Sequence, residues 1–355
     1  MILEEEYSEF VQRDWQTKRK EGPIRIAVIG LGKFARERAL PALQQTDLCE
    51  ATAVVGWTEE KARPVSNEFA IGHAMGYDEF KDGMASDTYD AVYIATPNAF
   101  HLEYIEAAAE LNKHVLCEKP LEKNAERAKR AVRVCKDTDV TLMTGYRMQV
   151  EPVIRRMREL IADEYIGEPV QLNAKFANRL PPENVADEWR VDPDISGGGA
   201  LIDLGIYPLN TTRFLLDKDP VAVYGTTSTH HSEFKDVDEH VTFELVFPDD
   251  VIASCTASLN AYSTSRLEVH GTEGEIKLES PFGGIVPDQI TAEREEMKTE
   301  YTGSPVNEII EEFDYFAHCI LTNTRPEPDG EDGLYDLNVI EAIYEAAETD
   351  CRVTL

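Results

Sequence analysis

The residue types in this chain best suited to chemistry are a lysine, an aspartate and a tyrosine, namely Lys119, Asp203 and Tyr207. A phenol, with an ordinary pKa of about 10, is a weak base at neutral pH, but a nearby ammonium stabilises the phenolate. Lys119 can therefore activate Tyr207 and stabilise negative charge that develops on a reacting oxygen. We expect Tyr207 to act as acid and base, with Lys119 as its electrostatic partner. Asp203 is expected to accept a hydrogen bond from a substrate hydroxyl or to orient Lys119.

The spacing of two of these residues supports their cooperation. Asp203 and Tyr207 are four residues apart, so on a helix they share one face, which Asn210 extends. The glycine run 197–199 stands just before them, and a helix is predicted after it. Taken alone, Tyr207 would be an amphipathic core tyrosine and Asp203 an acid of a first helical turn. The presence of Lys119 in its own motif favours the chemical interpretation.

A glycine-rich turn near the start of the chain predicts a dinucleotide site. Gly30-Leu-Gly32-Lys-Phe-Ala35 directly follows the apolar strand predicted at 24–29 and opens a helix. The first glycine permits the tight turn, the second lets the backbone approach a pyrophosphate, and Ala35 still allows the helix to pack on the strand. The helix N-terminus offers unpaired N–H groups to the phosphates. In the first βα turn of an alternating segment, this motif predicts a Rossmann domain.

The end of the next predicted strand distinguishes between cofactors. NAD-binding domains place an acid there to hold the ribose 2′-hydroxyl. This chain instead has Gly56, Trp57 and Thr58, with Lys61 just beyond. We therefore expect NADP.

The hydrophobic pattern divides the chain into two parts. Strands alternate with helices up to about residue 146, which predicts a doubly wound parallel sheet. Later strand-like segments follow one another with few helices, which predicts a large, open, mainly antiparallel sheet and an overall α/β class. The expected divisions are an acidic extension at 1–22, an NADP-binding Rossmann domain at 23–146, a substrate and oligomerisation domain at 147–330, and a C-terminal helix at 331–355 packing back on the Rossmann domain.

The charge of the chain restricts its partners. Asp and Glu number 67 against 35 Lys and Arg, a formal net charge of −32 spread along the whole sequence. A nucleic-acid binder needs the opposite sign to neutralise phosphates. Such self-repulsion is tolerated where salt screens it, with a Debye length of about 3 Å at 1 M. We expect a halophilic protein with no nucleic-acid partner.

The expected cellular compartment is inferred from membrane, secretory and cysteine patterns in the sequence. No apolar run approaches the ~18 residues of a membrane span, and the acidic N-terminus does not have the pattern of a secretory signal. The six cysteines form no CxxC pair, which is typical of reduced thiols. We expect a cytoplasmic protein without a membrane partner.

Several motifs follow one another along residues 23 to 355. They are Ala95-Thr-Pro-Asn98 with His101, Glu118-Lys119-Pro120, Gly145-Tyr-Arg-Met148, Trp189-Arg190, the glycine run followed by Asp203 to Asn210, and Gly271-Thr-Glu-Gly274. In this order they resemble the glucose–fructose oxidoreductase/inositol dehydrogenase (Gfo/Idh/MocA) family.

The resemblance implies a Rossmann domain, then an α/β domain whose open sheet makes dimer or tetramer contacts. It places the Glu-Lys-Pro lysine by the nicotinamide and the substrate. Many members have histidine where Tyr207 stands, and the tyrosine form is similar to the subgroup that contains glucose–fructose oxidoreductase and dihydrodiol dehydrogenase.

The resemblance and the motifs together give a set of candidate site residues. The resemblance implies that the protein oxidises an aldopyranose, D-xylose before other sugars, at C1 to the aldonolactone by hydride transfer to NADP. No metal is expected, and the polar stretch from His230 to His240 is interpreted as a solvated edge. The residues expected at the substrate are Lys119, Tyr146, Asp203, Tyr207 and Asn210. Those expected at the cofactor are Gly30, Gly32, Lys33, Phe34, Gly56, Trp57, Thr58, Lys61, Thr96, Pro97, Asn98, His101, Glu118, Lys119, Arg147, Trp189 and Arg190.

Three other functions stay open from the sequence. One is an enzyme that retains NADP and passes the hydride to a second sugar, and another is a reductase of a ketosugar or dicarbonyl. The third is a non-catalytic regulatory protein that only binds NADP. Such a protein could dispense with Lys119 and Tyr207, so their joint presence argues for catalysis.

Overall fold

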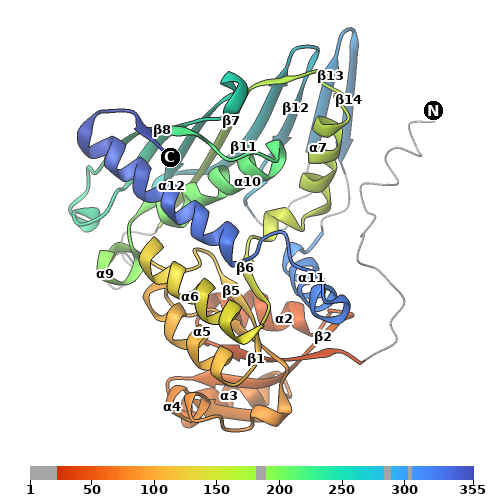
Figure 1. Cartoon of the computed structure of the whole chain (residues 1–355), viewed down its shortest axis with the longest axis vertical. Coiled ribbons are helices and arrows are strands. Elements are labelled where there is room, and N and C mark those ends of the chain that lie inside the picture. The colour runs from red at the N-terminus through yellow and green to blue at the C-terminus, as the bar shows by residue number, and fades with distance from the viewer. Residues whose placement is uncertain (1–21, 181–188, 284–288, 303–305) are drawn as a thin grey trace. The chain divides into compact units, whose positions relative to one another are not determined.

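The computed structural model describes residues 22–180, 189–283, 289–302 and 306–355 (Figure 1). The predicted N-terminal extension lies outside these residues except for Gly22. The described residues form two compact units. The Rossmann unit comprises residues up to 147 together with 307–337, and the sheet unit comprises 148–306 together with 338–355.

The C-terminal segment 331–355 contributes residues to both units, and its packing back on the Rossmann domain stays a prediction. Helix α12 (Gly330–Thr349) begins in the Rossmann unit, and its residues from 338 onward group with the sheet unit. The reason is the short strand β15 (Val353–Thr354), which pairs with the edge strand β8 (Ala222–Ser228) and ties the chain end to the second sheet.

The Rossmann unit contains a six-stranded parallel sheet in the order β3-β2-β1-β4-β5-β6. The central strands are buried along nearly their whole length, as expected where helices cover both faces. The order reverses between β1 and β4, which places a ligand crevice at the carboxyl ends of the strands. The strands are β1 (Ile24–Ile29), β2 (Cys49–Gly56), β3 (His73–Gly76), β4 (Ala91–Ile94), β5 (His114–Glu118) and β6 (Leu142–Gly145).

Helices connect these strands, and α5 and α6 lie side by side in Figure 1. The first helix contains a π-helical segment that begins at Ala35, the last residue of the glycine motif. The helical segments are η2 (Ala35–Ala39), α2 (Leu40–Leu43), α3 (Glu59–Glu68), α4 (Tyr77–Lys81), η3 (Ser86–Thr88), η4 (Asn98–Phe100), α5 (His101–Glu110), α6 (Ala125–Thr138), η5 (Arg147–Gln149) and α11 (Glu308–Thr322).

The sheet unit contains a nine-stranded sheet in the order β14-β13-β12-β11-β7-β10-β9-β8-β15. Strands β7 and β10 pair in parallel, and the other pairs given for the described residues are antiparallel. The predicted fold class is therefore confirmed. The remaining strands are β7 (Pro169–Arg179), β9 (His240–Val246), β10 (Ile252–Ser258), β11 (Asn260–Gly271), β12 (Gly274–Glu279), β13 (Gln289–Arg294) and β14 (Met297–Thr302).

One face of this sheet is covered and the other is exposed. Helix α10 packs on β7 and β10, and the side chains of β9 alternate between buried and exposed along the strand. Strands β13 and β14 escaped prediction because their polar sequences have no apolar run. The helical segments of the unit are α7 (Pro152–Ala162), η6 (Trp189–Val191), α9 (Pro193–Ser196), η7 (Leu201–Gly205), α10 (Ile206–Leu216), η8 (Ser232–Phe234) and η9 (Pro248–Asp250). Within the described residues, no helix has the length and apolar character needed to cross a membrane.

Candidate active site

The glycine turn after β1 has the geometry that a pyrophosphate requires. Gly30 has φ +92°, and a Cβ atom there would lie 2.7 Å from the carbonyl oxygen of Ala95. Gly32, by contrast, has no heavy atom near the position of a Cβ, which leaves room above the turn. Ala35 is buried at the start of η2. These residues fit a dinucleotide, while Lys33 and Phe34 are exposed beside the turn.

The end of β2 presents an exposed polar and aromatic surface. The Trp57 side chain is 74% exposed and meets Tyr77 edge-on, with ring centroids 6.2 Å apart. Thr58 caps helix α3 by accepting the N–H of Lys61 at 3.3 Å. Gly56 lies close to the side chain of Leu31. The flat ring and the exposed lysine can hold an adenosine that carries a 2′-phosphate.

The turns after β4 and β5 are tied together by a histidine. His101 is fully buried, and its Nε2 lies 2.8 Å from the carbonyl oxygen of Thr96. Its Nδ1 lies 3.1 Å from the carbonyl oxygen of Pro120, and the Lys119–Pro120 peptide bond is cis. His101 therefore positions both turns from beneath. Asn98 is also buried, and Pro97 is partly exposed.

Glu118 and Lys119 end β5 at the carboxyl edge of the sheet. The Tyr93 hydroxyl donates to Glu118 Oε1 at 2.6 Å, and the backbone N–H of Lys119 donates to Glu118 Oε2 at 3.3 Å. Both side chains are partly exposed. The carboxylate is thus fixed from below, next to the lysine that the sequence singled out.

Arg147, predicted at the cofactor, is engaged within the protein. Its guanidinium lies 2.5 Å from Glu308 Oε1, and its side chain is only 13% exposed. Tyr146 is also buried. Sequence reasoning missed Glu308 and its neighbour Glu312, although acids in the otherwise apolar helix α11 were an available signal.

In the sheet unit, the structure gives Asp203 a cationic partner. Asp203 lies in the π-helical segment η7, and the Nε of Arg190 is 3.3 Å from its Oδ2. The Arg190 guanidinium also covers the ring of Trp189, 4.5 Å from its centroid. Two residues predicted at the cofactor therefore organise the aspartate predicted at the substrate.

Tyr207 stands in the first turn of α10, within an aromatic cluster. Its ring centroid is 5.3 Å from that of Phe176 on β7, at an interplanar angle of 89°, and 5.8 Å from that of Phe282. Edge-to-face contacts of this kind fix ring orientation. No local pattern pointed to either phenylalanine, because their approach to Tyr207 depends on tertiary packing. Asn210 is buried and accepts a hydrogen bond from Gln149 at 3.0 Å.

A buried carboxylate holds the backbone just before Asp203. Asp238 accepts the N–H groups of Gly199 at 2.8 Å and Leu201 at 2.7 Å, and the Tyr344 hydroxyl at 2.8 Å. A Cβ on Gly199 would collide with the backbone of Asp238, so the glycine run is needed for this approach.

The prediction of a solvated edge from His230 to His240 is wrong for two of its acids. Asp238 and Glu239 are 8% and 0% exposed. Glu239 accepts the backbone N–H of His230 and the amide of Asn260, both at 2.7 Å. The loop folds inward because these donors solvate the carboxylate. Among the described residues, no cluster of three or more His, Cys, Asp or Glu has the arrangement to hold a metal ion.

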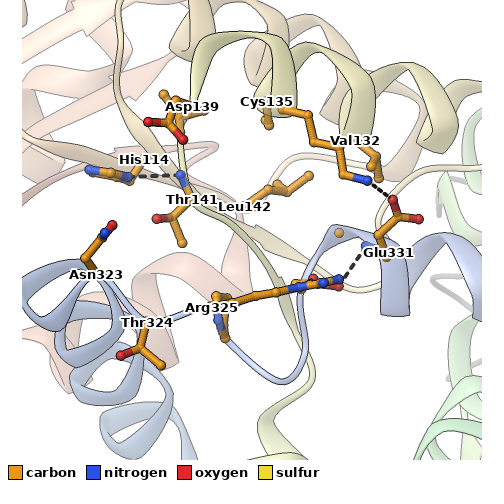
Figure 2. Close-up of a pocket in the computed structure, with 15 residues that line it drawn as sticks. His114, Val132, Cys135, Asp139, Thr141, Leu142, Asn323, Thr324, Arg325 and Glu331 are labelled. Carbon is orange, nitrogen blue, oxygen red and sulfur yellow. Dashed lines mark hydrogen bonds and ion pairs between the residues drawn. The ribbon is translucent and has the colours of Figure 1, made fainter.

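A separate pocket of about 350 Å³ lies in the Rossmann unit at the amino ends of β5 and β6 (Figure 2). Its wall includes His114 and Leu142, the first residues of these strands, whereas the residues predicted at the cofactor lie at the opposite ends. Its cations are ion-paired, Arg325 with Asp329 and Lys136 with Glu331. The pocket is therefore distinct from the dinucleotide crevice.

The predicted residues fall into two groups. The Rossmann unit brings together the glycine turn, the end of β2 and the turn that carries Glu118 and Lys119. The sheet unit brings together Arg190, Asp203 and Tyr207. The pairing of Lys119 with Tyr207 stays a prediction.

Known proteins resemble the chain along nearly its whole length. Residues 24–146 match the model of the oxidoreductase family with an NAD-binding Rossmann fold, and residues 154–277 match the GFO/IDH/MocA C-terminal domain. A D-xylose 1-dehydrogenase [NADP(+)] of Haloarcula marismortui is 49% identical, over 98% of this chain and 97% of its own.

Solved structures of similar fold also cover nearly the whole chain. An aldose–aldose oxidoreductase of Caulobacter crescentus, complexed with glycerol, has a TM-score of 0.88 and 29% identity, over 94% of this chain and 100% of its own. A 3-ketoreductase of Actinomadura kijaniata, in complex with NADP and TDP-benzene, has a TM-score of 0.80 and 26% identity, over 92% and 98%. Because both halves of the sequence match in order, the chain is an oxidoreductase that belongs to the Gfo/Idh/MocA family.

Proposed function

We propose that this chain is an NADP-dependent aldose 1-dehydrogenase that oxidises an aldopyranose, D-xylose before other sugars, at C1 to the aldonolactone. The observation that carries the proposal is the 49% identity, across 98% of the chain, to a D-xylose 1-dehydrogenase [NADP(+)]. The presence of Lys119, Asp203 and Tyr207 supports a catalytic protein over a regulatory one.

The cofactor is NADP. The 49% identical relative uses NADP(+), and the 3-ketoreductase of similar fold binds NADP. In this chain β2 ends without an acid, and Trp57, Thr58 and Lys61 are exposed there. Gly30 and Gly32 would hold the pyrophosphate, and the turn of Glu118 and Lys119 would adjoin the nicotinamide half.

The reaction converts an aldopyranose and NADP⁺ into a lactone, NADPH and a proton. When bound, NADP accepts the hydride from C1. In the proposed mechanism Tyr207 takes the proton of the C1 hydroxyl, and the Lys119 ammonium stabilises the developing negative charge. Asp203, oriented by Arg190, accepts a hydrogen bond from a neighbouring hydroxyl of the sugar. The aromatic contacts of Tyr207 hold the phenol in one orientation.

The test is formation of NADPH by the purified protein in molar KCl, followed by absorbance, with a panel of pentoses and hexoses. We expect turnover with D-xylose and release of the lactone. No turnover with any aldose would contradict the proposal. Equal or higher kcat/KM with NAD would contradict the cofactor assignment.

A second candidate is an aldose–aldose oxidoreductase that retains its cofactor, which the likeness to the Caulobacter structure favours. The two functions differ in a simple measurement. A retained cofactor would copurify with the protein, and free NADP would not be consumed while one sugar is oxidised and another reduced.

Substitution tests the assigned roles. Tyr207→Phe removes the proton acceptor and should lower kcat by a factor of about 10² to 10⁴. Lys119→Met should lower it similarly, while Tyr224→Phe, on the exposed side of β8, should leave it unchanged. Near-normal kcat in either site variant would refute the mechanism.

We further propose that the protein is halophilic, cytoplasmic and a homo-oligomer through its large sheet. The net charge of −32 supports the first, and the exposed outer face of the sheet, with Tyr224 and Ile252, supplies a surface for the last. Melting temperature should fall as KCl is lowered from molar to about 10 mM, where charge repulsion is barely screened. Light scattering should give the mass of a dimer or tetramer, and a monomer would contradict the assembly.

A further inference from the structure

Helix α11 brings an unusual carboxyl group beneath the turn of Glu118 and Lys119. Glu312 is 1% exposed, and its Oε1 has no hydrogen-bond partner among the described residues. A buried carboxylate without donors is costly, because it loses its hydration and gains nothing in return. The site therefore disfavours the charged form of Glu312.

The surroundings place Glu312 close to the end of β5. The next residue, Phe313, packs against Tyr93 with ring centroids 5.0 Å apart, and the Tyr93 hydroxyl donates to Glu118. Glu118 pairs with Gly145 in the sheet, two residues before Arg147. Thus α11, β4, β5 and the segment after β6 converge on one group of buried polar side chains.

The cationic side chain in this group, Arg147, is already ion-paired with another glutamate. Glu308 precedes Glu312 by one helical turn, on the same face of α11. It binds Arg147 at 2.5 Å and lies 3.5 Å from Arg38. Glu312 therefore faces two other carboxylates, Glu118 and Glu308, while the nearest guanidinium is held by one of them.

The electrostatics agree with this arrangement. Burial raises the pKa of Glu312 well above its usual value, the charges of Glu118 and Glu308 raise it further, and Arg147 opposes them. The pKa of Tyr93 is likewise raised by burial and by Glu118, so its hydroxyl remains a donor. The charged groups that act on Glu312 are Glu118 of β5, Arg147 of η5 and Glu308 of α11, and Glu312 in turn acts on Tyr93 of β4. Arg38 of η2 reaches the group only through Glu308.

We infer that Glu312 is a neutral carboxylic acid at neutral pH and a positioning residue for the nicotinamide half of the cofactor. With its proton in place, Glu312 adds no negative charge beside Glu118 at the end of β5. In a doubly wound sheet with its pyrophosphate turn after β1 and its ribose site after β2, the nicotinamide half lies over β4 and β5. Ionisation of Glu312 would add a second negative charge there, which favours the cationic NADP⁺ over NADPH.

A direct test is infrared spectroscopy of the full chain in molar KCl without cofactor. At neutral pH the wild type should show the carbonyl stretch of a protonated carboxyl group, and the isosteric Glu312→Gln variant should lack that band. Loss of the band from the wild type should occur at alkaline pH. Absence of any band removed by Glu312→Gln would overturn the inference, whatever the enzyme's substrate proves to be.

A second variant tests whether neighbouring carboxylates keep Glu312 protonated. Glu308→Gln removes a neighbouring negative charge and frees Arg147 to pair with Glu312, so the band should disappear at lower pH than in the wild type. Glu233→Gln, at an exposed position, should leave it unchanged. An unshifted band in Glu308→Gln would contradict the assigned carboxylate group.

The consequence for the cofactor is measured by equilibrium binding of NADP⁺ and NADPH against pH. In the wild type the ratio of the NADPH to the NADP⁺ Kd should rise on the order of tenfold as Glu312 ionises, because the added charge lies in a poorly screened site. In Glu312→Gln the ratio should stay flat, with both Kd values close to wild type at neutral pH. A wild-type ratio that does not respond would refute the positioning role. Failure of the proposed sugar chemistry would leave both measurements meaningful, since neither needs turnover.

Discussion

Two buried glutamates, one in each unit, show how differently this protein treats the same functional group. Glu239 in the sheet unit and Glu312 in the Rossmann unit are 0% and 1% exposed. Burial alone would raise the pKa of Glu239, yet hydrogen bonds from Asn260 and from the backbone at His230 and His231 hold it at about 2. Burial and neighbouring carboxylates raise the pKa of Glu312 well above its usual range.

The difference teaches that donors, and not depth, decide the charge of a hidden carboxyl group. At Glu239 the chain turns its N–H groups inward, so the protein replaces the water that the carboxylate lost. At Glu312 the partners are acceptors or are already bound, so the proton replaces the missing donors. Identical substitutions at the two positions should therefore have unequal effects.

The largest effect is expected from Glu239→Gln. The amide keeps one accepting oxygen and puts an NH2 group in place of the other, so either the backbone N–H groups of His230 and His231 or the amide of Asn260 lose their acceptor, at a cost of about 3 kcal/mol. The measurement is urea unfolding in molar KCl. Exposed Glu233→Gln is the control and should stay within about 0.5 kcal/mol of wild type. A loss for Glu239→Gln no larger than that of the control would break the comparison.

The pH dependence of the two substitutions should run in opposite directions. The pKa of Glu239 is lowered from 4.5 to about 2, so its contribution is present above pH 4.5 and is lost as the pH falls toward 2. The stability gap between wild type and Glu239→Gln should close there by at most about 1.4 kcal/mol per pH unit.

Glu312 has a raised pKa, so the protein is most stable relative to Glu312→Gln below the usual glutamate pKa. The wild type then loses stability as the pH rises through the raised pKa. Unfolding curves measured for both pairs across acid and alkaline pH check both signs. Parallel profiles for the two variants would show that the two carboxyl groups share one charge state.

A smaller effect is expected at Asp238, which lies between these extremes. Burial raises its pKa, although the Tyr344 hydroxyl and the N–H groups of Leu201 and Gly199 oppose that rise. Tyr344→Phe removes one of the three donors and should cost about 1 kcal/mol. Exposed Tyr224→Phe is the matched control for urea unfolding. Equal stability of the two variants would indicate that the hydroxyl does not support Asp238.

The smallest effect is expected from Glu312→Gln below pH 4.5, where the carboxyl group is protonated in the unfolded chain as well as in the folded protein. A neutral amide replaces a neutral acid of nearly equal size, so the free energy of unfolding should change by no more than about 0.5 kcal/mol. Urea unfolding beside Glu239→Gln gives the contrast directly. A loss as large as that of Glu239→Gln would mean that Glu312 carries a charge in the native protein.

The sequence determined the parts of this protein that depend on neighbours along the chain. Periodicity fixed the strand and helix alternation, and the spacing of Gly30 and Gly32 identified the dinucleotide turn, because both arise within one βα unit. Strand β3 and the hairpin of β13 and β14 were missed, since their short or polar sequences carry no hydrophobic pattern.

Only the tertiary structure decided which partners the polar groups meet. The ion pair of Arg190 with Asp203, the inward turn of Glu239 and the placement of Glu312 beneath Glu118 join segments from 9 to 194 residues apart. A carboxyl group's charge depends on donors and charges within a few ångströms, whichever part of the chain supplies them. Local sequence names the acid, but the fold chooses its neighbours and therefore its protonation.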